Sequence, residues 1–425
     1  MMNFFAIALV AAELVYGIFT GPGQDASTQM GISWAADTTA GSTFVKYTVE
    51  KDASWKHARI VRPQQEELWT AFDGVFSDDI NGKECYEHAR FIKCGVMLEG
   101  LKPDTGYKYV VVDGNGKEYA EHHFKTAGAR EWSCCIISDF HSYPPLPKRL
   151  ESAMDMIRTV EKFDPSVDWI FSPGDVVAWG GSYSFWRRLF EEEAFHKYFW
   201  GRVNGNHDNW TKESQITHNF DIPNDYFLGT SYFPRNSFEG EQGVVYHFRY
   251  GNALFLMLNT EDMNKKEVFT ATRDWMRKVV TEQRAGSNPP DFVIVCTHYE
   301  WFIGTNGRTS EYGRWHELFD ELGVDLAVAG NNHVYLRTDP IYQGKVMNPL
   351  DKKGTVYLVT SSSDDGRGRS FHESRFDNMD LIQCRWTEGP HTVSAVNAVF
   401  SPNDIKLKLL DRKGNVIDQA VVYKK

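Results

Sequence analysis

The sequence has no hydrophobic run long enough to cross a membrane and no block of basic residues. The apolar segment near its N-terminus covers residues 4–12 and ends at Glu13, whereas a spanning helix needs about 20 apolar residues. The segment resembles the hydrophobic part of a secretory signal peptide, although no Lys or Arg precedes it. We therefore expect residues 1–13 to be a signal peptide, with a first β-strand as the alternative. The protein is then expected to be secreted or to reside in an endomembrane or lysosomal lumen.

The low content of positively charged residues limits the kinds of partner that the protein can bind. The 425 residues include 46 Lys and Arg against 57 Asp and Glu, which gives a net charge of -11. Nucleic-acid binding usually requires a basic patch or stripe, so we expect no nucleic-acid partner. An acidic protein can still bind an anion where its site holds metal ions, because a bound cation dominates the local field.

Cysteine is also scarce, with six in the chain. Cys134, Cys135 and Cys296 fall in apolar runs that we expect to be buried strands, so they are interpreted as core residues. Cys85 and Cys94 are a pair that could form a disulfide, and the sequence leaves their state open. Cysteine usage therefore does not decide the compartment.

The first part of the chain is rich in β-strand patterns. Short alternating or β-branched runs, separated by turn sequences, occur at 31–34, 43–49, 95–98, 107–112 and 122–126. Several short strands at this spacing are typical of a β-sandwich. We expect this sandwich to occupy residues 14–128, followed by a short linker.

From residue 132 the pattern changes to alternating strands and helices. Continuous apolar runs, typical of strands buried on both faces, occur at 134–137, 169–171, 202–203, 292–296 and 326–329. Helical periodicity lies between them, as in Leu150, Met154, Ile157 and Val160. The pattern predicts a sheet covered by helices, finished by a β-hairpin at 405–423. This second domain is expected to cover residues 132–425.

Each of the five apolar runs is followed by a short polar motif. The motifs are SDFH at 138–141, PGD at 173–175, GNHD at 205–208, THY at 297–299 and GNNH at 330–333. Ligands of open α/β sheets bind at the carboxyl ends of the strands. If the five strands are neighbours in one sheet, the Asp, Asn and His side chains meet along a single edge.

Such a cluster has three explanations: a satisfied polar network, a general acid–base pair or a metal site. A network predicts scattered positions, whereas each group here follows a strand, beside a glycine in three motifs (Gly174, Gly205 and Gly330). Glycine lets the backbone turn sharply, so that the next side chain points into the site. The five motifs together favour metal binding. Mixed imidazole, carboxylate and amide ligands suit Fe, Zn or Mn, and one carboxylate can bridge two ions.

In this order the motifs resemble those of the calcineurin-like metallophosphoesterases, especially relatives of the purple acid phosphatases. GISW at 31–34 and LEGLKPDTGY at 98–107 resemble the fibronectin type III-like domain of that group, and HVY at 333–335 and GTVY at 354–357 continue the likeness. The resemblance covers nearly the whole chain. It implies an all-β fibronectin type III-like sandwich, followed by an α/β sandwich of the calcineurin-like phosphoesterase type with mixed β-sheets flanked by helices.

The resemblance also implies two metal ions (Fe, Zn or Mn) and a role for each motif residue. The ligands implied for the first ion are Asp139, His141, Asp175 and His333. The ligands implied for the second ion are Asp175, which bridges the two, Asn206 and His298. His207 is expected to donate a proton to the leaving group or to stabilise the transition state. Asp208 is expected to orient the imidazole of His207, the alternative being a carboxylate at a turn or helix start.

Three positions depart from the family pattern. Purple acid phosphatases have a coloured iron–tyrosine bond three residues after the bridging Asp; here that position is Ala178, so we expect no purple colour. Asn331 stands where the family normally has a His ligand of the second ion. An amide oxygen is a weaker and harder donor, so the second ion is expected to bind less tightly or to be Mn or Mg. The alternative is that Asn331 only shapes a turn.

Arg308 is the third departure, since plant members carry a pair of His residues in that loop. A guanidinium can clamp two phosphate oxygens, so Arg308 is a candidate substrate-binding residue. The alternative is a solvated loop residue, which is the common state of arginine.

The expected function is hydrolysis of phosphate monoesters by a metal-bound hydroxide at a dinuclear site, as in acid phosphatases. The alternatives are a phosphodiesterase or nucleotide hydrolase with the same centre, and a non-catalytic binding protein with a weakened second metal site. We expect a small phosphate-ester substrate. The sequence does not separate monoesters from diesters, because loops such as 300–313 and 361–373 carry no readable motif, and it does not determine the oligomeric state.

Overall fold

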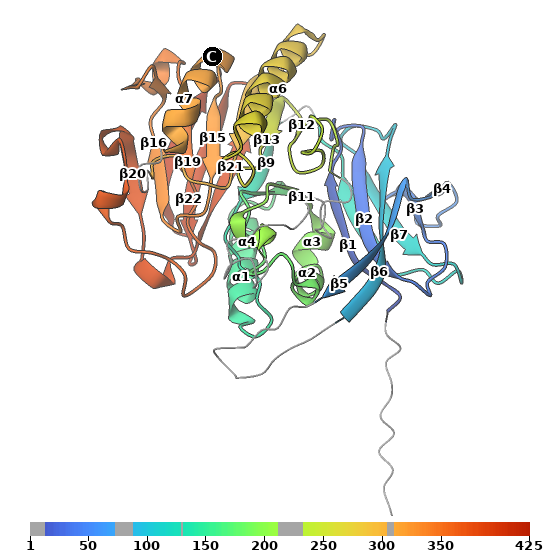
Figure 1. Cartoon of the computed structure of the whole chain (residues 1–425). Helices are drawn as coiled ribbons and strands as arrows, with labels where there is room; N and C mark the ends of the chain where they lie inside the picture. Colours follow the sequence, from blue (N-terminus) through green and yellow to red (C-terminus); the bar gives the residue numbers. More distant parts are fainter. Residues whose placement is uncertain (1–12, 73–87, 129–130, 211–232, 304–309) are drawn as a thin grey trace, which may run out of the picture.

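The computed structural model describes residues 13–72, 88–128, 131–210, 233–303 and 310–425 (Figure 1). The apolar segment 4–12 of the expected signal peptide lies outside these residues, as do Cys85 and Arg308. Cys94 is a buried free thiol. None of the helices in the described residues combines the length and the hydropathy that a membrane span requires.

The N-terminal part is a sandwich of two antiparallel sheets. One sheet contains β1 (Val15–Pro22), β2 (Met30–Asp37), β6 (His88–Leu98) and β5 (Gln65–Phe72). The other contains β4 (Arg59–Val61), β3 (Phe44–Val49), β7 (Gly106–Val112) and β8 (His122–Lys125). Alternate residues of the two sheets, such as Trp34 and Tyr109, share one buried core. The predicted β-sandwich is confirmed, while β1, β4 and β5 are strands that the sequence patterns do not reveal.

One sheet of this sandwich continues into the second part of the chain. β1 pairs in parallel with β11 (Phe199–Arg202), through Thr20 opposite Phe199. Beyond β11 follow β10 (Val167–Ser172) and β9 (Trp132–Ile136), and then the antiparallel β21 (Ser394–Phe400), β22 (Asp404–Asp411) and β23 (Val416–Tyr423). The result is one ten-stranded sheet in which the predicted C-terminal hairpin forms the far side.

A second sheet of seven strands faces the first. Its order is β12 (Tyr246–Tyr250), β13 (Ala253–Met257), β14 (Phe292–Cys296), β15 (Leu326–Ala329), β19 (Val356–Val359), β16 (Tyr335–Thr338) and β20 (Ile382–Trp386). A small hairpin, β17 (Ile341–Tyr342) and β18 (Lys345–Val346), lies outside it. All five predicted strands exist, but the expectation that they share one sheet is wrong: β9, β10 and β11 belong to one sheet and β14 and β15 to the other.

Helices cover the outer faces of both sheets, which gives four layers (Figure 1). α1 (Lys148–Phe163), α2 (Tyr183–Leu189) and α3 (Glu193–Lys197) pack on the ten-stranded sheet, and α6 (Lys266–Ala285) and α7 (Glu311–Leu322) on the seven-stranded sheet. The side chains of each strand alternate between the layers: Cys134 and Ile136 face the opposite sheet, while Cys135 packs against the helices. These strands are apolar along their whole length because one face packs against the opposite sheet and the other against the helices, as predicted.

Aromatic rings fill the space between the two sheets. The Trp169 ring stacks on Phe199 at 5.1 Å and meets Phe255 edge to face, also at 5.1 Å. Trp132 stacks on Phe400 at 3.9 Å between ring centroids. Phe255 comes from the seven-stranded sheet, so these contacts hold the two sheets, and with them the strand ends, in a fixed relative position.

Replacing Trp169 by alanine tests this packing. Trp169 is 0% exposed, so Trp169→Ala is expected to lower the free energy of unfolding by about 3–5 kcal/mol, the usual cost of emptying an aromatic site in a core. Urea denaturation followed by circular dichroism measures the change. Leu350→Ala is the control, because Leu350 is 70% exposed and its loss should change stability by less than about 0.5 kcal/mol. Equal losses in the two variants would contradict the role of the inter-sheet core.

Candidate metal centre

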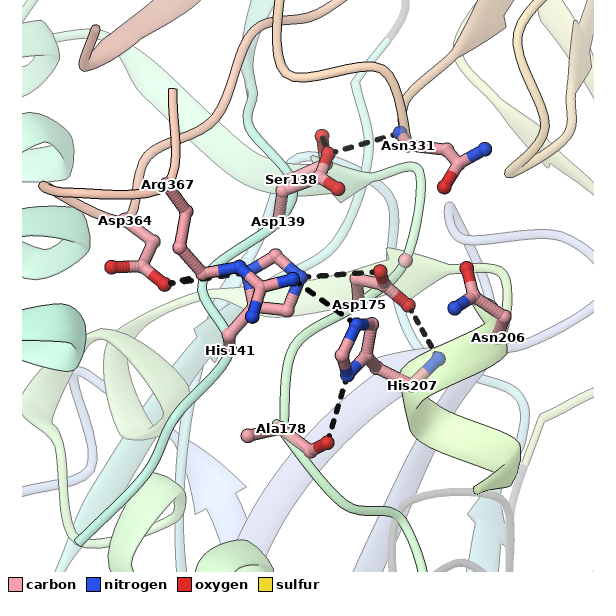
Figure 2. A network of polar contacts seen from close by, with 12 residues as sticks. Ser138, Asp139, His141, Asp175, Ala178, Asn206, His207, Asn331, Asp364 and Arg367 are labelled. Atoms are coloured by element: carbon pink, nitrogen blue, oxygen red, sulfur yellow. Dashed lines mark hydrogen bonds and ion pairs between the residues drawn. The ribbon is translucent and has the colours of Figure 1, made fainter. Parts of the chain in front are cut away.

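The five polar motifs meet in one place although their strands belong to two sheets. SDFH follows β9, PGD follows β10, and GNHD runs into the short α4 (Asn206–Asn209) after β11. THY and GNNH follow β14 and β15. Because the sheets face each other and the carboxyl ends of these strands lie on the same side, side chains from both sheets converge, and Figure 2 shows residues of four of the motifs around Asp175.

Several of these residues hold a left-handed backbone conformation. The φ angle is 57° at Asp139, 46° at His141, 55° at Asp175, 67° at Asn331 and 61° at His333. These are five of the ten non-glycine residues with positive φ in the described part of the chain, so such geometry is concentrated at this site. Positive φ is unfavourable for residues with a Cβ and is typical of functional sites, where surrounding contacts maintain it.

The three motif glycines act in two different ways. Gly174 has a φ of 104°, as the predicted sharp turn requires. Gly205 and Gly330 do not have positive φ, and they are needed for space. A Cβ on Gly205 would lie 2.1 Å from Oδ1 of Asp175, and one on Gly330 would lie 2.9 Å from Oδ2 of Asp139. For these two positions the predicted reason was wrong: close approach to a carboxylate, rather than a turn, excludes a side chain.

Each of the two central carboxylates has one oxygen fixed and one oxygen turned toward histidines. Oδ2 of Asp139 accepts hydrogen bonds from Ser138 Oγ at 2.5 Å and from the Asn331 N–H at 3.2 Å, while its Oδ1 lies 3.4 Å from Nε2 of His333. Oδ1 of Asp175 accepts from the His207 N–H at 2.9 Å. Its Oδ2 lies 3.3 Å from Nε2 of both His141 and His298. Oδ2 of Asp175 therefore lies between the two histidines.

Two histidines of the cluster, His298 and His333, are oriented by backbone carbonyls. Nδ1 of His298 lies 2.7 Å from Pro173 O, and Nδ1 of His333 lies 2.8 Å from Arg367 O. A carbonyl oxygen only accepts, so Nδ1 carries the proton and the lone pair of Nε2 faces the site. Burial, and then the Arg367 charge, lowers the pKa of His333 to about 3, which keeps this imidazole neutral. Burial opposes protonation of His298 too, but the Asp175 carboxylate beside it raises its pKa to about 10. A cation binding there would displace that proton.

The ring of His141 faces a carboxylate instead, without a hydrogen bond to it. Its Nδ1 lies 3.4 Å from Oδ2 of Asp364, and both side chains are fully buried. Burial, followed by the Arg367 charge, holds the pKa of His141 well below its usual value. The sequence patterns do not single out Asp364. They contain a signal for it, because the polar run SSSDD at 361–365 follows β19 directly, just as the five motifs follow their strands.

The arrangement fits metal ions. Oδ1 of Asp139, Oδ2 of Asp175 and both ring nitrogens of His141 are buried without a hydrogen-bond partner, which is costly unless something else satisfies them. Donors about 2.0–2.1 Å from a tetrahedral ion lie about 3.3–3.4 Å apart, which matches the separations given above. One group of such donors is Asp139, His141 and His333, and another is Asp139, Asp175 and His298.

The two asparagines lie on the His298 side of this cluster. Oδ1 of Asn206 is 3.2 Å from Nε2 of His298. The amide nitrogen of Asn331 donates to Oε2 of the buried Glu300 at 2.6 Å. Since a carboxylate binds the nitrogen end, the Asn331 oxygen is turned inward, and Figure 2 shows it directed toward Asn206 and Asp175. Glu300 thus fixes the amide in the orientation that a metal ligand requires, and a turn-forming role alone does not explain this contact.

His207 and Asp208 have different surroundings from those predicted. Nδ1 of His207 bonds to Ala178 O at 2.8 Å, and its Nε2 lies 3.2 Å from Nη2 of Arg367. The Asp208 carboxylate accepts four backbone N–H groups, from Asp175, Val176, Val177 and Gly205, at 2.8–3.2 Å. The prediction that Asp208 orients the His207 imidazole is wrong; Asp208 holds the loop that carries Asp175, which is closer to its alternative as a carboxylate at a helix start.

The structure therefore brings together Asp139, His141, Asp175, Asn206, His207, His298, Asn331 and His333. Arg308 lies outside the described residues, so its predicted role in substrate binding stays a prediction. Arg367, which no sequence pattern singled out, is the arginine that the described structure places beside His207.

Comparison with known proteins agrees with this geometry. Residues 134–335 match the calcineurin-like phosphoesterase family, and residues 16–126 match the purple acid phosphatase N-terminal domain. The chain thus carries a calcineurin-like phosphoesterase domain behind a purple acid phosphatase N-terminal domain.

Individual relatives are distant. An uncharacterized protein of Mycobacterium tuberculosis is 23% identical over 402 residues, covering 82% of this chain and 69% of that protein. Acid phosphatase type 7 of Danio rerio is 27% identical over 180 residues, covering 37% of this chain and 39% of the fish protein. The structure of a purple acid phosphatase from yellow lupin (Lupinus luteus) seeds matches 96% of this chain and 74% of its own, with a TM-score of 0.71 at 18% identity. PhoD matches 100% of this chain and 90% of its own, with a TM-score of 0.59 at 12% identity. These structural matches establish the fold.

The position of Asp208 predicts a structural role for its charge. Asp208→Asn replaces an acceptor-only carboxylate by a group whose amide nitrogen would face backbone N–H donors, so we expect a loss of about 3 kcal/mol in the free energy of unfolding. His207→Asn, on the next residue, leaves those four hydrogen bonds in place and should cost clearly less. Thermal unfolding of both metal-free variants distinguishes them, and an unchanged melting temperature in Asp208→Asn would refute the loop-holding role.

The contact between Glu300 and Asn331 predicts an effect of Glu300 on the affinity of the site for a metal ion near Asn331. Glu300→Leu removes the acceptor that fixes the Asn331 amide, so the more weakly bound ion is expected to lose about 10- to 100-fold in affinity, the usual effect of losing a partner that orients a ligand. Calorimetric titration of metal-free protein with Mn²⁺ or Zn²⁺ measures this loss. Glu300→Gln is the matched control, because its amide oxygen still accepts from Asn331. Equal metal binding by parent, Leu and Gln variants would show that Glu300 does not act on the metal centre.

Proposed function

We propose that this protein hydrolyses phosphate monoesters with two divalent metal ions held at the candidate centre. The observation that carries the proposal is the position of Asp175: the same oxygen, Oδ2, lies 3.3 Å from Nε2 of His141 on one side and of His298 on the other. A carboxylate oxygen so placed between two sets of nitrogen and oxygen donors suits two neighbouring cations better than one.

The proposed ligands divide into two groups that share Asp175. The first group is Asp139, His141, Asp175 and His333. The second group is Asp175, Asn206, His298 and Asn331. Fe, Zn and Mn suit this mixture of imidazole, carboxylate and amide donors, and the second group, with two amide oxygens and one imidazole, is the one that favours the harder ions. When bound, the ions supply Lewis-acid chemistry, which lowers the pKa of water and offsets the negative charge of a phosphate.

The protein side chains around the ions exclude bulk water and fix orientation. Asp139, His141, Asp175 and His298 are at most 1% exposed, so charge interactions in the site are only weakly screened by solvent. His207, at 8% exposure, is the imidazole beside the ligands that bonds to no carboxylate through its ring nitrogens in the contacts described.

Reconstitution tests the proposal. Full-length protein freed of metal by chelation is expected to hydrolyse no ester, and addition of Mn²⁺, Zn²⁺ or Fe²⁺ should restore cleavage of p-nitrophenyl phosphate, with about two ions bound per chain. Asp175→Ala should bind fewer ions and show only background hydrolysis, because both ligand groups lose their shared oxygen. Metal content by mass spectrometry and release of nitrophenol are the measurements.

Two outcomes would overturn the proposal. Hydrolysis by Asp175→Ala at the rate of the parent would exclude the shared-carboxylate site. Cleavage of bis(p-nitrophenyl) phosphate but not of the monoester would replace a monoesterase by a phosphodiesterase with the same centre. The matched control is Asp155→Ala, which removes a carboxylate that is 71% exposed on α1 and should leave both metal content and hydrolysis unchanged.

A further inference from the structure

A group of arginines lies at the solvent side of the metal centre. Two of them lie beside Asp364: Nε of Arg149 is 3.4 Å from Oδ2 of Asp364, and Nε of Arg367 is 3.9 Å from the same oxygen. Arg369 and Arg375 are close enough to influence one another, since burial and then the Arg375 and Arg367 charges lower the pKa of Arg369. In a chain with a net charge of -11, this concentration of positive charge beside the site needs an explanation.

Arg367 contacts more of the site than the others. Its backbone carbonyl bonds to Nδ1 of His333 at 2.8 Å, its Nε faces Asp364, and its Nη2 lies 3.2 Å from Nε2 of His207. Its side chain is 29% exposed, whereas Asp364 is fully buried. The guanidinium therefore lies between Asp364 and His207 (Figure 2).

The hydrogen bond to His207 has only one possible direction. A guanidinium has no acceptor, so Arg367 donates and Nε2 of His207 accepts. The Nδ1 contact with the carbonyl of Ala178 agrees, because it places the ring proton on Nδ1. In this arrangement His207 has no proton on Nε2 to give to a leaving group. Its contact instead fixes the direction of the Arg367 fork.

The charge balance leaves room for an anion. Two guanidiniums share the single carboxylate of Asp364, so one positive charge there has no buried partner of its own in the described contacts. Both arginines direct Nε toward Asp364, and one N–H of the Arg367 Nη2 bonds to His207, which leaves Nη1 and the second N–H of Nη2 for other acceptors. Planar guanidinium forks bind phosphate oxygens bidentately.

We infer that Arg367 binds the phosphate group of the substrate and that His207 is a positioning residue for its guanidinium. This inference rests on the proposed function, and it adds a basis for selecting the substrate by its charge. A phosphate monoester carries close to two negative charges at pH 7 and a diester carries one, so the additional positive charge favours the monoester. The role expected of Arg308 stays a prediction, because that residue lies outside the described residues.

Binding of inorganic phosphate to the metal-loaded full-length protein tests the first part. Arg367→Gln is expected to weaken phosphate binding by about 10- to 100-fold, the range for loss of charged hydrogen bonds, with unchanged metal content, because the bond to His333 comes from the main chain. Arg367→Lys keeps the charge but lacks the planar guanidinium, so its phosphate affinity should lie between those of the parent and Arg367→Gln. The control is Arg158→Gln, which removes an arginine that is 61% exposed on α1 and should change nothing.

Steady-state kinetics test the charge selectivity. The KM for p-nitrophenyl phosphate should rise more in Arg367→Gln than the KM for bis(p-nitrophenyl) phosphate. Phosphate affinity within about twofold of the parent, or an equal effect on both esters, would overturn the inference. So would a loss of metal in parallel with the loss of phosphate, because the role would then be structural.

A double-mutant comparison tests the positioning role of His207. His207→Ala should weaken phosphate binding, and His207→Gln, whose amide oxygen can accept from Arg367, should restore part of it. Combined with Arg367→Gln, His207→Ala should add no further loss if His207 acts through Arg367. If the fold losses in phosphate affinity of the two single variants multiply in the double variant, His207 contacts phosphate independently of Arg367, which contradicts the positioning role.

These outcomes are separable from those of the proposed function. If the parent hydrolyses no ester but binds phosphate through Arg367, the proposed function fails and the inference stands. If the parent hydrolyses monoesters and Arg367→Gln binds phosphate normally, the proposed function stands and the inference fails.

Discussion

The buried charge of Asp175 is the constraint on which the rest of the site depends. Its carboxylate is 1% exposed, and an unpaired buried carboxylate costs several kcal/mol. Although burial opposes ionisation, the neighbouring His298 and His207 hold the pKa of Asp175 well below its usual value. One oxygen is fixed by the His207 N–H, and the loop that carries Asp175 is fixed by Asp208. The other oxygen lies between two imidazoles, where a cation completes the balance of charge.

The fold supplies the rigidity that this arrangement needs. The candidate ligands reach the site from the ends of strands in two different sheets, so the distance between Asp175 and His298 depends on how the sheets pack. The Trp169 and Phe255 rings, at 5.1 Å, lie in that packing layer. The N-terminal sandwich contributes indirectly, because β1 pairs with β11 and so extends the sheet whose strand ends carry Asp139, Asp175 and Asn206.

Sequence patterns were most informative where chemistry and secondary structure coincide. The motif residues were found because each follows an apolar run, and the structure brings them together. Asp364 carries the same signal, because it lies in the polar run after β19, but its pattern was not singled out among the motifs. The prediction for Asp208 failed because the family resemblance implied a side-chain contact with His207, whereas the first turn of a helix directs the carboxylate to backbone N–H groups. Arg367 has no local pattern, since its partners His207, His333 and Asp364 lie at least three residues away and two of them lie more than 30 residues away along the chain.

The sequence by itself determined the five strands that precede the polar motifs, the change from a β-rich to an α/β pattern, the residue types of the candidate donors and the departure of Asn331 from histidine, because these depend on local periodicity and residue type. The tertiary structure decided that the donors come from two sheets, that Glu300 turns the Asn331 oxygen inward, and that Arg367 and His207 are paired. Those facts depend on contacts between segments far apart in the chain, and local patterns do not encode which distant partner a buried polar group will find.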